Sequence, residues 1–126
     1  MKYLKSIAFI FSFVTYTTAH GEPIPEETAI KCASYYEILS VTGDLNDITS
    51  KKSSRAFYAF SKRLPGSKNQ NSIAEELVKM RNEIPGKLTE EGISDFRKKY
   101  DPTCRENLFQ AWCEAYGDIT KDACIK

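Results

Sequence analysis

Four cysteines are the residues of this 126-residue chain whose chemistry depends most on where the protein folds. They are Cys32, Cys104, Cys113 and Cys124. Cysteines can hold a metal ion or exchange thiols in a reducing compartment, whereas in an oxidising compartment they form disulfides. No two of these cysteines have the C-x-x-C spacing that is typical of thioredoxin-like exchange. Their role therefore depends on whether the chain is exported.

The first 21 residues have the three-part pattern of a secretory signal peptide. A short positive start precedes an apolar run over residues 7–14, and small residues follow it. This run is too short to cross a bilayer as a mature helix, and no later stretch is apolar enough to do so. Cleavage after Gly21 is preferred, with cleavage after Ala19 and an uncleaved anchor helix as alternatives. We therefore expect a signal peptide over residues 1–21 and oxidised cysteines in the remaining chain.

The sequence offers little for catalysis or metal binding. The only histidine, His20, falls in the expected leader, so the mature domain has no imidazole for a catalytic triad or a zinc site. Neither a glycine-rich phosphate loop nor an acidic calcium loop is present. Carboxylates are candidates by type alone, because a glycosidase-like pair needs a deep cleft. We expect no enzyme, no cofactor and no metal. The carboxylates considered are Asp95, Asp101, Glu106 and Glu114.

Charge is nearly balanced overall but uneven along the chain. The formal charge of +1 falls to about −1 when Lys2 and Lys5 leave with the leader, which gives no reason to expect nucleic acid as a partner. A basic stretch runs from position 51 to position 68. It holds Lys51, Lys52, Arg55, Lys62, Arg63 and Lys68. Such a stretch is usually a solvated helix face, and its functional interpretation is contact with an acidic partner or an anionic envelope polymer.

Aromatic residues near the C-terminus form a second candidate surface. Phe109, Trp112 and Tyr116 recur at i, i+3 and i+7, which places them on one face of a helix. The simpler interpretation is a final helix that packs on both sides. The alternatives are an exposed patch for a protein partner, because Trp and Tyr dominate interface hot spots, and the wall of an apolar ligand cavity.

Helical periodicity runs through the mature chain, and Gly and Pro residues divide it. Helices are expected over residues 26–41, 47–64, 71 or 72–84, 89–100 and 102–116. The break between the last two is predicted at Asp101-Pro102, where Asp101 could cap a new helix. Ser72 and Glu75 resemble a capping box at the start of the third helix. Because no segment alternates with a period of two, we expect an all-α bundle of four to five helices.

The predicted helices restrict the pairing of the cysteines. Cys104 and Cys113 would lie about 13 Å apart along one helix, whereas the Cα atoms of a disulfide lie within about 7 Å. We therefore expect a Cys32–Cys104 disulfide between the first and last helices and a Cys113–Cys124 disulfide that closes the tail. The alternative pairs Cys32 with Cys113 and Cys104 with Cys124.

Residues 32–36, with the sequence Cys-Ala-Ser-Tyr-Tyr, resemble the opening helix of small uncharacterised periplasmic proteins of proteobacteria. Tyr100, a few residues before Cys104, is similar to the ending of those proteins. The resemblance covers roughly residues 26–108, and the C-terminal tail departs from it. It implies a periplasmic location and a fold, and no activity.

We therefore expect residues 22–126 to form a single exported helical domain, periplasmic or alternatively secreted, that binds a protein partner in the cell envelope. An immunity protein or an enzyme inhibitor would act in this way. The alternative is a small helical carrier of an apolar ligand or lipid, which would need an internal apolar cavity. The candidate partner-binding residues are Phe109, Trp112, Tyr116, Lys51, Lys52 and Arg55.

Overall fold

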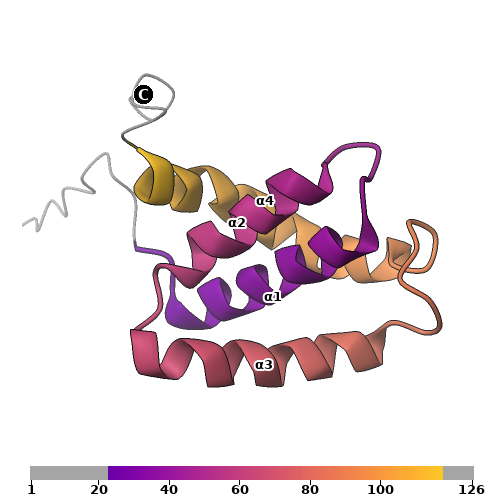
Figure 1. Cartoon of the computed structure of the whole chain (residues 1–126), viewed down its shortest axis with the longest axis horizontal. Helices are drawn as coiled ribbons and strands as arrows, with labels where there is room; N and C mark the ends of the chain where they lie inside the picture. Colours follow the sequence, from indigo (N-terminus) through magenta and orange to yellow (C-terminus); the bar gives the residue numbers. More distant parts are fainter. Residues whose placement is uncertain (1–22, 118–126) are drawn as a thin grey trace, which may run out of the picture.

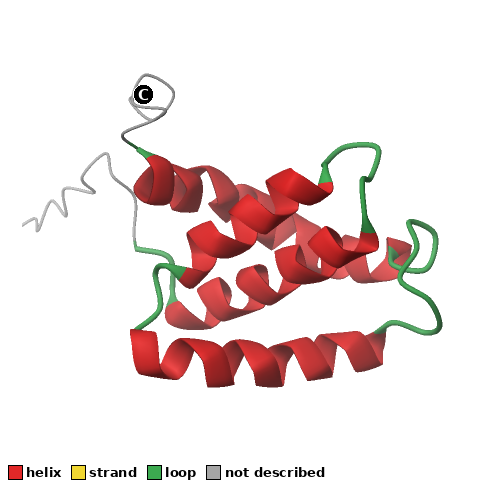
Figure 2. Cartoon of the chain, in the orientation of Figure 1, coloured by secondary structure: helices red, strands yellow, loops and turns green. Residues whose placement is uncertain are grey.

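The chain folds into an all-α bundle. The computed structural model describes residues 23–117, apart from the side chains of residues 67–69. The helices are α1 (Glu26–Thr42), α2 (Ser50–Ser61), α3 (Gly66–Glu83) and α4 (Ser94–Tyr116). Residues 23–117 contain no strand (Figure 2). The expected all-α bundle is confirmed, with four helices in this range.

Helix α1 is central, and it contacts the other three helices (Figure 1). Helix α3 lies on one side of α1, while α2 packs on α1 and on α4. Helix α1 is buried on most of its circumference because its neighbours cover it from several sides. Two glutamates in its first turn favour the positive end of the helix dipole. Gly43 ends the helix with φ 109°, a conformation that favours glycine.

The Cys32–Cys104 disulfide joins α1 to α4, as expected. The two Cα atoms are 5.2 Å apart and both cysteines are buried. The alternative that pairs Cys32 with Cys113 is therefore wrong. Cys113 is not a free thiol. The expected Cys113–Cys124 disulfide and the expected signal peptide involve residues outside the described range.

The predicted helix break at Asp101-Pro102 is wrong, because α4 continues through Pro102. Pro102 lacks the N–H that would bond the carbonyl of Lys98. Both residues lie on the exposed side of α4, where water can satisfy that carbonyl. On either side of the proline, α4 is fixed to the core by buried Tyr100 and by the disulfide at Cys104. Tertiary packing therefore keeps one 23-residue helix where the local sequence favours two.

Other helix boundaries also differ from the sequence-based expectation. Helix α2 is shorter at both ends, and α4 begins at Ser94 instead of position 89. Helix α3 begins at Gly66, directly after Pro65, so the predicted capping box lies inside it. The first turn and a half of α3 is polar in sequence and carries no apolar period. Periodicity could therefore not show where α3 begins.

Aromatic rings fill the core between α1, α2 and α4. Tyr36 stacks on Phe60 with ring centroids 5.8 Å apart, and Tyr35 lies 5.6 Å from Phe96 and 6.5 Å from Tyr100. These five side chains are buried. None of the described helices has the length and apolar content required to span a membrane.

Candidate functional site

The two groups of candidate binding residues meet on one surface, although they are far apart in sequence. The Tyr116 hydroxyl donates a hydrogen bond of 2.9 Å to the backbone carbonyl of Arg55. The ring of Tyr116 also lies 6.0 Å from the ring of Tyr58 on α2. We call this surface the α2–α4 face. It comprises Lys51, Lys52, Arg55, Tyr58, Phe109, Trp112 and Tyr116.

The aromatic part of the α2–α4 face is partly core and partly surface. Trp112 and Tyr116 are half-buried, pack against the core and have ring centroids 4.9 Å apart. Phe109 and Tyr58 are exposed, at 47% and 51% of their surface. Helix α4 therefore packs inward through Trp112 and still presents Phe109 outward, and binding of a protein partner here stays a prediction.

Sequence analysis missed Tyr58 as a member of this surface. Lys51, Arg55 and Tyr58 recur at i, i+4 and i+7, so the helical period alone places them on one face of α2. This spacing could have predicted that Tyr58 belongs to the surface, because it groups an aromatic residue with the exposed cations.

The basic part of the α2–α4 face lacks internal neutralisation. Lys51, Lys52 and Arg55 are exposed, and their charged groups form no ion pair within the described residues. The sequence has no acidic residue between Asp47 and Glu75, so α2 provides no carboxylate at i+3 or i+4. Positive charge on this face is therefore available to a partner.

A partly buried polar network fixes the loop before α2 to α4. Arg97 donates to both carboxylate oxygens of Asp47, at 2.9 and 2.7 Å. Arg105 donates to Asp47 at 2.7 Å and to Asp101 at 3.0 Å. The buried Tyr35 hydroxyl donates to Asp101 at 2.5 Å and accepts from Arg97 at 3.2 Å. Three segments distant in sequence are thus tied together by charged hydrogen bonds.

The network explains several shifted pKa values. The hydrogen bonds from Arg97 lower the pKa of Asp47 to about 2, and those to Asp47 raise the pKa of Arg97. Burial raises the pKa of Tyr35 and of Tyr36 well above the usual value. Asp47 is therefore a fixed anion at neutral pH, which suits it to hold the arginines and not to donate a proton.

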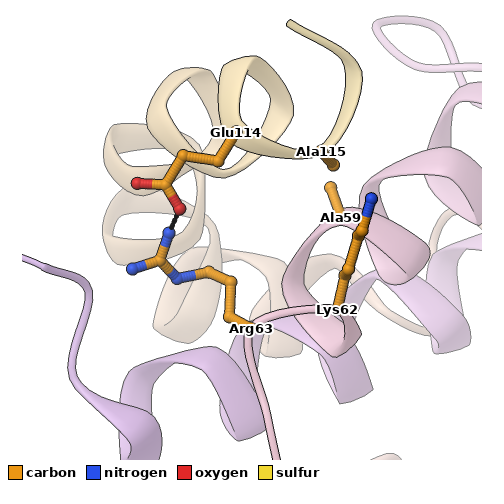
Figure 3. Close-up of a pocket in the computed structure, with 5 residues that line it drawn as sticks. All are labelled: Ala59, Lys62, Arg63, Glu114 and Ala115. Atoms are coloured by element: carbon orange, nitrogen blue, oxygen red, sulfur yellow. Dashed lines mark ion pairs between the residues drawn. The ribbon is translucent and has the colours of Figure 1, made fainter.

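The carboxylates considered for catalysis do not converge. Asp95 and Glu106 are exposed on α4, and Asp101 belongs to the network of Tyr35. Glu114 forms an ion pair with Arg63 across a pocket of about 340 Å³ between the C-terminal ends of α2 and α4. Figure 3 shows these two side chains pointing toward each other. Within the described residues, no group of three His, Cys, Asp or Glu side chains could hold a metal ion.

A smaller pocket of about 200 Å³ opens between α2 and α4 beside the charged network. It is lined by Tyr36, Asp47, Ile48, Lys52, Arg97, Asp101, Arg105 and Leu108. Tyr36 is only 2% exposed, and its hydroxyl makes no hydrogen bond with any described residue. This oxygen is not among the sealed side-chain atoms that lack a partner in the described residues, so it opens into the pocket.

A further pocket of about 570 Å³ lies between α1 and α3. Glutamates from both helices line it, together with Lys31 and Lys79. It is therefore a charged surface groove and not an apolar ligand cavity.

Comparison of the chain with protein-family models, with curated proteins and with solved structures found no match.

Proposed function

We propose that this chain is a non-catalytic exported helical domain that binds a protein partner in the cell envelope through the α2–α4 face. In this proposal two disulfides brace the domain, Cys32–Cys104 and Cys113–Cys124. One observation carries the proposal, the hydrogen bond from Tyr116 to the backbone of Arg55. It sets the aromatic residues of α4 beside the cations of α2 on two packed helices.

The composition of this face supports a protein as the partner. Interfaces are enriched in aromatic residues and arginine, and a few such residues carry most of the binding energy. Phe109 and Tyr58 present exposed rings, while half-buried Trp112 packs against Tyr116, which in turn contacts Tyr58. A face built on packed helices loses little conformational entropy when it binds.

Two observations support export. The Cys32–Cys104 disulfide favours an oxidising compartment. The N-terminal residues have the pattern of a signal peptide. We place the domain in the periplasm, and not in the medium, on the resemblance of residues 32–36 to small periplasmic proteins, which is a hypothesis from the sequence.

No specific observation favours the alternative, a carrier of an apolar ligand. A carrier needs an enclosed apolar cavity. Tyr35, Tyr36, Phe60 and Met80 occupy the centre of the bundle. The pockets between α1 and α3 and between α2 and α4 carry ionisable side chains.

Site-specific photo-crosslinking in the organism that produces the chain tests this proposal. Benzoylphenylalanine is placed at Phe109 or Tyr58 in the full-length chain, and at Val78 as a matched control. Val78 is 63% exposed on α3 and lies away from the α2–α4 face. We expect the same protein adduct from Phe109 and Tyr58, and no such adduct from Val78.

A charge-reversal variant separates specific binding from non-specific contact. Arg55→Glu combined with crosslinking at Phe109 should reduce the adduct at least about fivefold. The substitution replaces an attraction between Arg55 and an acidic group of the partner by a repulsion between like charges. Circular dichroism checks that this variant is folded. Equal adducts from all three positions, or an adduct that Arg55→Glu leaves unchanged, would rule out binding through this face.

A further inference from the structure

The pocket between α2 and α4 combines features that a carboxylate ligand requires. Its wall holds three cations, Lys52, Arg97 and Arg105, against two carboxylates, Asp47 and Asp101. The formal charge of the lining is therefore +1. Both carboxylates already accept from the arginines. The cation left without a counter-ion is Lys52, which forms no ion pair within the described residues.

The free hydrogen-bond donors of this pocket belong to different helices. Lys52 is exposed at its rim on α2 and has three N–H donors. Arg105, on α4, uses Nε and one terminal nitrogen for Asp101 and Asp47, so the other terminal nitrogen remains available. Tyr36, on α1, is only 2% exposed, and its hydroxyl forms no hydrogen bond with any described residue.

The hydroxyl of Tyr36 is a donor that the described residues leave open to this pocket. Burial raises the pKa of this hydroxyl, so it stays protonated at neutral pH and can only gain by donating to an acceptor. Tyr35, its neighbour in sequence, donates to Asp101 in the way that Tyr36 does not. The hydroxyl of Tyr36 is therefore left to water or to a ligand that enters the pocket.

We propose that this pocket binds one carboxylate of the partner protein, an Asp or Glu side chain that accepts from Tyr36, Lys52 and Arg105. This inference rests on the proposed function, because the pocket shares Lys52 with the α2–α4 face. One singly charged carboxylate neutralises the lining, and a volume of about 200 Å³ accommodates a group of that size. Leu108 and Ile48 provide an apolar wall for the methylene groups of the same side chain. The partner therefore presents an acidic residue next to an apolar one that lies on Phe109 and Tyr58.

A titration with a model compound tests the pocket directly. The probe is N-acetylglutamate α-amide, which carries a single side-chain carboxylate, and the neutral control is N-acetylglutamine α-amide. Binding is followed by NMR on the isotope-labelled, oxidised mature domain at constant ionic strength. We expect saturable shifts at Tyr36, Lys52 and Arg105 with a Kd on the order of millimolar, and no saturation with the glutamine compound.

Variants identify the donors. Tyr36→Phe removes only the hydroxyl, and Lys52→Met removes the charge but keeps the apolar stem. Each variant should raise the Kd of the glutamate probe at least about fivefold. Lys79→Met, on α3 and outside this pocket, makes the same charge change and should leave the affinity within about twofold. Absence of saturable shifts, or equal effects of Lys52→Met and Lys79→Met on the Kd, would overturn the proposal that this pocket binds a carboxylate.

The source of the carboxylate is tested with the crosslinked adduct from position 109. If Tyr36→Phe and Lys52→Met reduce that adduct as they reduce probe binding, the carboxylate comes from the protein partner. If the wild-type adduct forms but neither variant changes it, this inference fails while the proposed function stands. If the probe binds and no adduct forms, the pocket binds a carboxylate but the proposed function fails. Binding to phosphatidylglycerol vesicles that both variants abolish would assign the pocket to a lipid headgroup and overturn the inference.

Discussion

Arg97 on α4 holds both carboxylate oxygens of Asp47, a residue 50 positions earlier in the chain, at 2.9 and 2.7 Å. This two-point contact fixes the loop between α1 and α2, because a planar guanidinium matches a carboxylate in position and in orientation. Helix α2, which carries the cations of the proposed binding face, begins three residues after Asp47. The geometry of the surface therefore depends on this pair.

Replacing Arg97 should destabilise the fold. Arg97→Ala removes the donors to Asp47 and leaves the partly buried Asp101 with fewer partners, at a cost of about 2 kcal/mol. Urea denaturation followed by circular dichroism measures it. The control is Lys98→Ala, an adjacent residue that is 79% exposed, which should change the free energy of unfolding by less than about 0.5 kcal/mol. Equal effects of the two variants would show that the pair is not stabilising.

Stability should fall in acid through Asp47. The pKa of Asp47 in the folded protein is about 2 because of its hydrogen bonds from Arg97, while an unfolded Asp has a pKa of about 3.9. A lowered folded pKa stabilises the protein above the unfolded value, and this contribution is lost as the pH falls from about 4 toward 2. Across this range, the melting temperature of the wild type should fall more steeply with decreasing pH than that of Asp47→Asn. Asp95→Asn, at an exposed position, should retain the wild-type slope.

The neighbouring tyrosines should respond differently to loss of the hydroxyl. Tyr35→Phe removes a hydrogen bond to the Asp101 carboxylate and should cost about 1.5 kcal/mol. Tyr36→Phe removes a hydroxyl without a partner and should change the free energy of unfolding by less than about 0.5 kcal/mol. Denaturant titration of both variants under one set of conditions gives the comparison. A large cost for Tyr36→Phe would mean that its hydroxyl is already satisfied within the protein.

Both disulfides can be mapped by mass spectrometry of a tryptic digest without reduction. We expect the peptide of residues 32–51 to be linked to that of residues 100–105, and the peptide of residues 106–121 to that of residues 122–126. The same digest should lack the residues of the leader and begin at Glu22. Free thiols in the natural product, or an intact Met1, would contradict export.

Removing the Cys32–Cys104 disulfide should lower stability substantially. It closes an interval of 72 residues, for which loop entropy gives about 4 kcal/mol. The double variant Cys32→Ala/Cys104→Ala avoids leaving a single buried thiol. Its loss in the free energy of unfolding, measured by urea denaturation, should exceed that of Arg97→Ala. A double variant as stable as wild type would mean that packing alone positions α1 on α4.

The sequence predicted the parts of the fold that follow from periodicity. Helical geometry excluded the pairing of Cys104 with Cys113, and the faces of two helices favoured Cys32–Cys104 over the swapped alternative. The structure decided between the two. The boundary at Pro102 was wrong because the packing around Tyr100 and Cys104 outweighs a local preference that costs only a few kcal/mol.

The charged network could not be predicted in the same way. Asp47 lies in a loop, and nothing in its local sequence indicates Arg97 as its partner. The proposed binding face was predicted in two halves, the cations around Lys52 and the aromatics around Trp112. Only the packing of α2 on α4 brings the halves together. Nothing in the sequence distinguishes Tyr35 from Tyr36, and only the fold shows that Tyr35 donates to Asp101 while Tyr36 bonds no described residue.

The placement of α3 has a consequence for how the domain opens. Helix α3 packs mainly on α1, and Glu83 near its C-terminal end accepts a hydrogen bond from Tyr100. No disulfide of the described residues holds it, whereas α1 and α4 are covalently joined. The outer helix can thus detach as a separate cooperative unit, and its amides would exchange with solvent deuterium before those of the other helices. Such partial unfolding would leave α1, α2 and α4 assembled, so the half of the molecule that carries the proposed α2–α4 binding face would survive fluctuations that melt the opposite half.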